Sequence, residues 1–293
     1  MLTKQEQNRL EILAEQIRLE ALKAIVHCGR GHVGGAMSMA DALAVLYGDI
    51  MRYDPERPRM ENRDRFVLSK GHAGPGLYAA LALAGFYPMD ALKTLNQPHT
   101  SLPSHCDMNK TPGVDMSSGS LGLGLSAAIG MALASRVMGV EYDTYVMIGD
   151  GECDEGQIWE GLLMAAHHKV DNLVALFDVN KDQLDGQTED ICGLGDLAAK
   201  LREFGWHTRE VDGHSVSAIH EALLEAKEEK GRPSTVVLNT VKGYGCPNVL
   251  RLPVCHAVDY LQPEAVRQGL EDISYLEKKI EGLKGGAAGN DKA

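Results

Sequence analysis

Long apolar runs and an excess of positive charge are both missing from this chain of 293 residues. No stretch approaches the ~20 consecutive apolar residues that a membrane-spanning helix requires. With 29 Lys and Arg against 41 Asp and Glu, the net charge is −12, which disfavours binding to nucleic acid or to an anionic membrane. The charged N-terminal segment, residues 1–16, contains no apolar core of a signal peptide, so we expect a cytoplasmic protein.

The chain also lacks closely spaced cysteines and contains few phenylalanines. The six cysteines are scattered without a CxxC pair, at positions 28, 106, 153, 192, 246 and 255, which favours reduced thiols over a disulfide framework. A zinc site built from Cys153 with His167 or His168 is a weaker alternative. Only 4 phenylalanines stand against 32 glycines, a composition typical of an α/β protein with many tight turns.

Apolar segments of strand length alternate with longer segments of helical periodicity. The expected strands lie at 65–69, 144–148, 173–178, 207–211 and 235–240. The expected helices lie at 5–27, from about Ser38, and at 76–84, 123–137, 156–168 and 215–229. This alternation predicts an α/β fold, a doubly wound parallel sheet with helices on both faces. We expect one domain over 1–281 with an N-terminal helical extension, an irregular segment over 96–122, and a disordered tail over 282–293.

A carboxylate stands between two glycines at the end of the second expected strand. This is Gly149-Asp150-Gly151, and Asn180 follows the next strand after 28 intervening residues. The carboxyl ends of parallel strands meet at one edge of a sheet, where ligands bind. Carboxylate and amide oxygens suit Mg²⁺ or Ca²⁺ that shares further ligands with a phosphate, and the start of helix 156–168 favours an anion. These features predict a diphosphate held by a divalent ion; the competing interpretation is that Asp150 only caps the next helix.

This motif resembles the thiamine diphosphate motif, and other segments resemble transketolases in the same order along the chain. They are GRGHVGGAMSMADAL (29–43), LSKGHAGPGLYAAL (68–81), SSGSLGLGLSAAIGMA (117–132), and the late loop VKGYGCPNVLRLPVCHAV (241–258). The resemblance spans roughly residues 8–260 and covers the first, diphosphate-binding (PP) domain of a full transketolase. The chain therefore resembles the N-terminal subunit of a split transketolase, with the thiamine diphosphate-binding fold.

The resemblance implies a role for particular residues. The metal, Mg²⁺ or Ca²⁺, would be held by Asp150, Asn180 and the backbone carbonyl of Asp182. Thiamine diphosphate would be contacted by His72 and Gly151 at the diphosphate, Gly119 at the aminopyrimidine, and Leu121 and Leu184 beside the rings. Glu155 is implied near the cofactor at the subunit interface. The catalytic histidines would be His32 near the donor hydroxyls, His72, His105 facing the donor carbonyl, and His256 between diphosphate and substrate.

The implied activity is a transferase reaction of carbohydrate metabolism. A two-carbon ketol unit passes from a ketose or ketose phosphate to an aldose or aldose phosphate. The cofactor supplies a carbanion, and neutral histidines can move protons on hydroxyls near pH 7. In the family, the activating glutamate and the phosphate-binding arginines belong to the pyrimidine-binding and C-terminal domains. A heterotetramer with a separate C-terminal subunit is therefore implied, and this chain alone would be inactive.

Some positions depart from the family pattern, and three alternatives stay open. Val33 replaces a proline, Ser38 a glycine, and Cys106-Asp107 a Pro-Glu pair. These differences weaken the prediction of the donor sugar more than the prediction of the cofactor. A related carboligase, similar to 1-deoxyxylulose-5-phosphate synthase, is the nearest alternative. The segment GLGLSAA (122–128) also mimics the GxGxxA motif of dinucleotide-binding oxidoreductases, although no clear strand precedes it. The third alternative is a non-catalytic, partner-binding paralogue.

Overall fold

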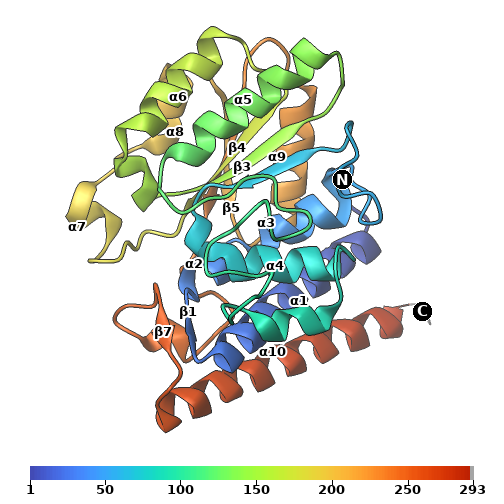
Figure 1. Ribbon diagram of the computed structural model, residues 1–293, viewed down its shortest axis with the longest axis vertical. Coiled ribbons are helices and arrows are strands. Elements are labelled where there is room, and N and C mark those ends of the chain that lie inside the picture. The colour runs from blue at the N-terminus through green and yellow to red at the C-terminus, as the bar shows by residue number, and fades with distance from the viewer. Residues whose placement is uncertain (291–293) are drawn as a thin grey trace.

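Five parallel strands form the central sheet in the order β2-β3-β4-β6-β5 (Figure 1). The computed structural model describes residues 1–290. The strands are β2 Arg65–Leu68, β3 Thr144–Gly149, β4 Leu173–Val179, β5 His207–Asp212 and β6 Ser234–Asn239. The five strands expected from the sequence are therefore confirmed, as is the parallel α/β architecture.

Both faces of the sheet are buried, because successive side chains of a strand point to opposite sides. Along β3, Tyr145 and Met147 belong to one apolar cluster, whereas Val146 and Ile148 belong to the other. The second cluster is covered by α5 Leu123–Met138, α6 Gly156–His167 and α8 Leu197–Glu203. The first is covered by α3 Ala40–Val45, α4 Gly74–Leu83 and α9 Val216–Glu228. The sheet is thus doubly wound (Figure 1).

Two long helices form an outer layer and contribute buried side chains to the first cluster. Helix α1, Lys4–Cys28, begins with a capping box at Thr3 and ends at Gly29, which has a φ of 87°. It packs against α3, α4 and α10, and α10 spans Pro263–Asn290. The helix α10 therefore covers most of the segment for which a disordered tail was predicted; it is anchored through buried Leu276 and Ile280 and continues beyond them. Residues 291–293 lie outside the described residues.

The N-terminal half differs from expectation at the second helix. The sequence predicted a start near Ser38, whereas α2 spans Gly34–Ser38 and α3 follows after a break at Met39. A π-helical turn, Leu46–Ile50, extends α3. Shorter elements complete the chain: the 3-10 turns Gly71–Ala73, Met89–Thr94, Gly151–Asp154 and Val249–Arg251, and α7 Thr188–Cys192.

A second, very small sheet joins distant parts of the chain. Strand β1, Arg30–Gly31, pairs antiparallel with β7, Val258–Asp259. Residues 96–122 form turns without a helix or a strand, as predicted, so α5 does not follow a strand and the dinucleotide-motif interpretation lacks its structural context. Among the helices of residues 1–290, none is both long enough and apolar enough to cross a membrane.

Candidate active site

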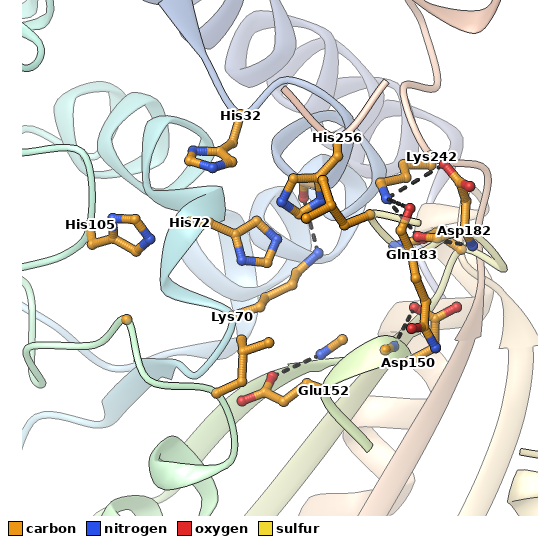
Figure 2. Close-up of a pocket in the computed structure, with 17 residues that line it drawn as sticks. His32, Lys70, His72, His105, Asp150, Glu152, Asp182, Gln183, Lys242 and His256 are labelled. Carbon is orange, nitrogen blue, oxygen red and sulfur yellow. Dashed lines mark hydrogen bonds and ion pairs between the residues drawn. The ribbon is translucent and has the colours of Figure 1, made fainter. Parts of the chain in front are cut away.

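A pocket of about 290 Å³ lies at the carboxyl edge of the sheet. Its walls come from the ends of β2, β3 and β4, the segment before α5, and the loops beside β1 and β7 (Figure 2). The predicted site residues that line it are His32, His72, His105, Gly119, Leu121, Asp150, Gly151, Asn180, Asp182, Leu184 and His256. Glu155 does not line it. That side chain is exposed, and its Cβ would lie 3.0 Å from a Cβ placed on Gly122, at the start of α5.

Four histidines gather on one side of the pocket (Figure 2). The ring of His32 has its centroid 5.4 Å from that of His72, 5.6 Å from that of His105 and 5.2 Å from that of His256. His72 and His256 are 4.7 Å apart. His32 directly follows β1 and His256 precedes β7, so pairing of these two strands brings together histidines that lie at opposite ends of the sequence.

The pocket keeps three of the four histidines, His32, His72 and His256, uncharged. Burial, together with the positive charge of Lys70, lowers the pKa of His72 to about 2. Burial and Lys242 lower the pKa of His256 to about 4, and burial also lowers the pKa of His32. At neutral pH each of these rings has one donor nitrogen and one acceptor nitrogen, which is the state required for passing protons between hydroxyl groups.

Asp150 follows β3 and is held in place by three donors. Its Oδ2 accepts hydrogen bonds from the backbone N–H of Lys181 at 2.6 Å and from the Thr188 hydroxyl at 3.1 Å. Its Oδ1 accepts from the backbone N–H of Gly151 at 2.9 Å. Burial and the neighbouring Asp178 raise the pKa of this carboxyl. A cation bound beside Asp150 would favour its ionised form.

Asn180 and Asp182 bring two further oxygens to the same wall. The Asn180 side-chain amide donates from Nδ2 to Asp178 Oδ2 at 2.9 Å, and its Oδ1 accepts from the backbone N–H of Asp182 at 3.3 Å. The Asp182 carbonyl accepts from Lys242 Nζ at 2.6 Å. A carboxylate, an amide oxygen and a backbone carbonyl form a donor set suited to Mg²⁺ or Ca²⁺.

Other kinds of metal site find no support in the described part of the chain. Within residues 1–290, no group of three or more His, Cys, Asp or Glu side chains is placed to hold a metal ion. This gives no support to the zinc alternative, and Cys153 is a buried free thiol like Cys106 and Cys246.

One buried donor supports the fit of a diphosphate. The Gln183 side-chain Nε2 is buried and has no hydrogen-bond partner among the described residues. A Cβ placed on Gly151 would lie 3.0 Å from Gln183 Cγ, so the glycine allows this amide to lie close to the strand end. A buried amide without a partner is costly; a phosphate oxygen would satisfy it, and Lys242 adds a positive charge to the same pocket.

Four side chains that line the pocket were not identified from the sequence: Lys70, Glu152, Gln183 and Lys242. The carboxylate of Glu152 is buried and accepts from the backbone N–H groups of Gly122 at 2.8 Å and Gly149 at 3.1 Å, and from the Ser69 hydroxyl. It thereby fastens the start of α5 to the ends of β2 and β3. Lys70 and Lys242 come soon after β2 and β6, so the rule that ligands bind at the carboxyl edge could have identified both.

The fold and the pocket together define an α/β protein with carboxylate, amide, lysine and histidine side chains gathered at the carboxyl edge of its sheet. Comparison with known families gives the particular one. Residues 10–268 match the family described as transketolase, thiamine diphosphate binding domain. The chain belongs to this transketolase family, so the predicted family is confirmed.

Individual relatives divide into subunits and whole enzymes. The chain is 50% identical over 241 residues to the 6-deoxy-6-sulfo-D-fructose transketolase subunit SqwG of a Clostridium species, covering 82% of this chain and 88% of that one. It is 35% identical to an apulose-4-phosphate transketolase subunit of Phocaeicola vulgatus, covering 93% and 98%. Transketolase 2 of Escherichia coli is 37% identical, but only 37% of its length is covered.

Solved transketolases share the fold. The structure of the Leishmania mexicana transketolase matches with a TM-score of 0.81 at 29% identity, covering 94% of this chain and 46% of that one. The chain thus spans less than half of the transketolase structure that it matches, and most of the length of relatives named as subunits.

Proposed function

We propose that this chain is the cofactor-binding subunit of a split transketolase. It would transfer a two-carbon ketol unit from a ketose, or ketose phosphate, to an aldose or aldose phosphate. The observation that carries this proposal is one pocket in which a set of hard oxygen ligands lies beside four close histidines. Oxygen ligands suit a metal-bound diphosphate, and uncharged histidines suit proton transfer at sugar hydroxyls.

The residues present fit thiamine diphosphate with Mg²⁺ or Ca²⁺. Asp150, Asn180 and the Asp182 carbonyl would hold the metal. His72, Gly151, Gln183 and Lys242 would meet the diphosphate, while Gly119, Leu121 and Leu184 would meet the rings. When bound, the cofactor would supply a carbanion as the nucleophile for the donor carbonyl.

The four histidines would hydrogen-bond the substrate and transfer its protons. His32 and His105 line the pocket away from the oxygen ligands (Figure 2) and would hydrogen-bond donor hydroxyls and the donor carbonyl region. His72 and His256 lie between them and the two lysines, and would orient the diphosphate and move protons at the reacting carbon. Because the pKa values of His72 and His256 are lowered, both rings would be neutral at pH 7 and each could accept a proton.

A separate C-terminal subunit would complete the site. Apolar side chains are exposed on neighbouring helices α5 and α6, at Leu123, Val137, Met138, Leu163 and Met164. Exposed apolar groups that gather on one part of a surface typically mark an interface, and stable obligate interfaces bury ~2,000 Å² or more. The names of two relatives as transketolase subunits support a partner chain, and two copies of this chain with two of the partner would be the simplest assembly.

The choice of sugar would depend largely on the partner. The names of two relatives refer to a sulfonated ketose and to a branched-sugar phosphate, so sugars outside the common pentose and hexose phosphates belong in the substrate screen. The pocket in this chain would recognise the ketose carbonyl and adjacent hydroxyls through histidines. The group at the far end of the sugar would be bound by the other subunit.

The test is reconstitution. The chain is purified alone and together with a C-terminal transketolase-type chain from the same source, and ketol transfer is measured with thiamine diphosphate and Mg²⁺. We expect no turnover alone and turnover in the mixture, with a sulfonated, branched or ordinary ketose as donor. Turnover by the isolated chain would contradict the split enzyme. Release of CO₂ from pyruvate without ketose cleavage would favour the carboligase alternative.

A further inference from the structure

Asp178 is a fully buried carboxylate near the end of β4, directly next to the pocket but not part of its lining. It collects donors from four parts of the chain. Its Oδ2 accepts from the Ser38 hydroxyl at 2.7 Å, from Asn180 Nδ2 at 2.9 Å and from the ammonium of Lys70. Its Oδ1 accepts from the Thr240 hydroxyl at 2.5 Å. The carboxylate therefore connects α2, the loop after β2, and the ends of β4 and β6.

One of these contacts determines which way the Asn180 amide faces. An ionised carboxylate can only accept hydrogen bonds, so Asn180 must turn its NH₂ group towards Asp178. The amide oxygen then lies on the opposite side, where it accepts from the backbone N–H of Asp182 at 3.3 Å. The flipped amide would put two oxygens of like partial charge together and would present N–H groups where a cation is expected.

Lys70 is what allows a charge at this position. The Lys70 ammonium is itself buried and donates to the Gly35 carbonyl at 3.0 Å as well as to Asp178. An isolated buried carboxylate is strongly unfavourable, whereas a hydrogen-bonded ion pair is tolerated. The pair thus supplies an acceptor-only group beneath Asn180 without leaving a net charge in the core.

We infer that Asp178 is a positioning residue that selects the oxygen-presenting orientation of Asn180 and thereby sets the affinity of the site for its divalent cation. The inference rests on the proposed function, because it takes Asn180 as a metal ligand. Groups that orient a metal ligand from behind typically contribute about 10- to 100-fold in metal affinity. The same range is expected here.

The experiment removes the acceptor and its counter-ion together. In Lys70→Met/Asp178→Leu, no carboxylate remains and no lysine is left unpaired, and such replacements of buried ion pairs are often compatible with folding. The first measurement is the apparent Kd for Mg²⁺ in the assembled enzyme at saturating thiamine diphosphate. The second is the binding of Mn²⁺ to the same site, followed by electron paramagnetic resonance. We expect binding weaker by about 10- to 100-fold. Ser38→Ala is the matched control, because it removes a donor to the same oxygen but leaves the Asn180 contact; its Kd should not change.

A rescue separates orientation from general damage. A carboxylate presents oxygen whichever way it is turned, so adding Asn180→Asp to the double variant should restore metal affinity. Damage to the packing around Asp178 would not be repaired by this change. The isosteric pair Asp178→Asn and Asp178→Asn/Asn180→Asp repeats the comparison without the larger leucine, should the first set fail to fold.

The outcomes distinguish this inference from the proposed function. Unchanged metal affinity in the folded Asp178 variants, or failure of Asn180→Asp to restore it, would overturn the positioning role. If Asn180→Ala alone leaves Mg²⁺ affinity unchanged, the metal assignment in the proposed function fails as well. If Asn180→Ala abolishes binding while the Asp178 variants bind normally, only the positioning role is refuted.

Discussion

The ammonium of Lys242 lies 2.6 Å from the backbone carbonyl of Asp182, an oxygen expected to face the metal ion. The same Nζ is 3.2 Å from the carbonyl of Gln183. A single lysine of the late loop thus binds two consecutive carbonyls of the loop after β4. This contact places a positive charge in the wall where the proposed diphosphate would lie, and it ties together two loops that the site needs.

The first prediction concerns that charge. Lys242→Met should weaken binding of thiamine diphosphate to the assembled enzyme by about 10- to 100-fold, because a hydrogen bond to a charged group contributes about 1.5–3 kcal/mol. Binding of thiamine, which has no phosphate, should be unaffected. Isothermal titration with both ligands measures the difference. Lys227→Met, a change outside the pocket, is the control, and equal loss for both ligands would contradict a diphosphate contact.

The second prediction concerns the metal ligands. Asp150→Ala and Asn180→Ala should each lose the Mg²⁺-dependent thermal shift that thiamine diphosphate gives with the partner present. The physical reason is that each substitution removes one of few protein oxygens available to the ion. Asp185→Ala is the control, since Asp185 is exposed, near Asp182 in sequence and outside the pocket. A full thermal shift in both ligand variants would refute the metal assignment.

The third prediction concerns pH. The pKa of His256 is lowered to about 4 in the folded chain from 6.5, so below pH 6.5 the unfolded chain binds a proton that the folded chain does not. Stability should therefore decrease as pH falls from about 6.5 towards 4, and this loss should be absent above that range. His256→Gln should reduce the decrease in Tm between pH 7 and pH 5. His167→Gln changes an exposed position on α6 and should leave the decrease in Tm as it is in the unaltered chain. The same decrease in the unaltered chain and in both variants would contradict the prediction.

The fourth prediction concerns assembly. Val137→Lys and Leu163→Lys place a charge on the exposed apolar side chains of α5 and α6, and should prevent or weaken association with the C-terminal subunit, because burying an unpaired charge is costly. Sedimentation of the mixed subunits measures this. Leu270→Lys makes the same chemical change at an exposed leucine of α10, on the other side of the molecule in Figure 1, and should assemble normally. Assembly of the α5 and α6 variants at unaltered affinity would exclude this face.

The strands and the histidines could be predicted from sequence for different reasons. Each strand is a short apolar run flanked by turn residues, so its signal is local. The histidines lie in segments that resemble transketolases over many positions. The role of Asp178 could not be predicted in either way. Its partners Ser38, Lys70 and Thr240 are between 62 and 140 residues away along the chain. The sequence also does not distinguish a carboxylate at a strand end that faces solvent from one that faces a buried lysine. Helix α10 was also missed, although its sequence carries a local signal: it begins at Pro263 and places the buried Leu276 and Ile280 four residues apart.

The pairing of β1 with β7 has a consequence for the order of events during synthesis. Only two residue pairs, Arg30 with Asp259 and Gly31 with Val258, form this ladder, yet it fixes the approach of His32 and His256. Contacts between residues so far apart in the chain form late, because the entropy of closing the long loop must be overcome first. His256 can therefore join His32, His72 and His105 only after the segment around residue 259 has emerged from the exit tunnel, later than the segments that form β2 to β6.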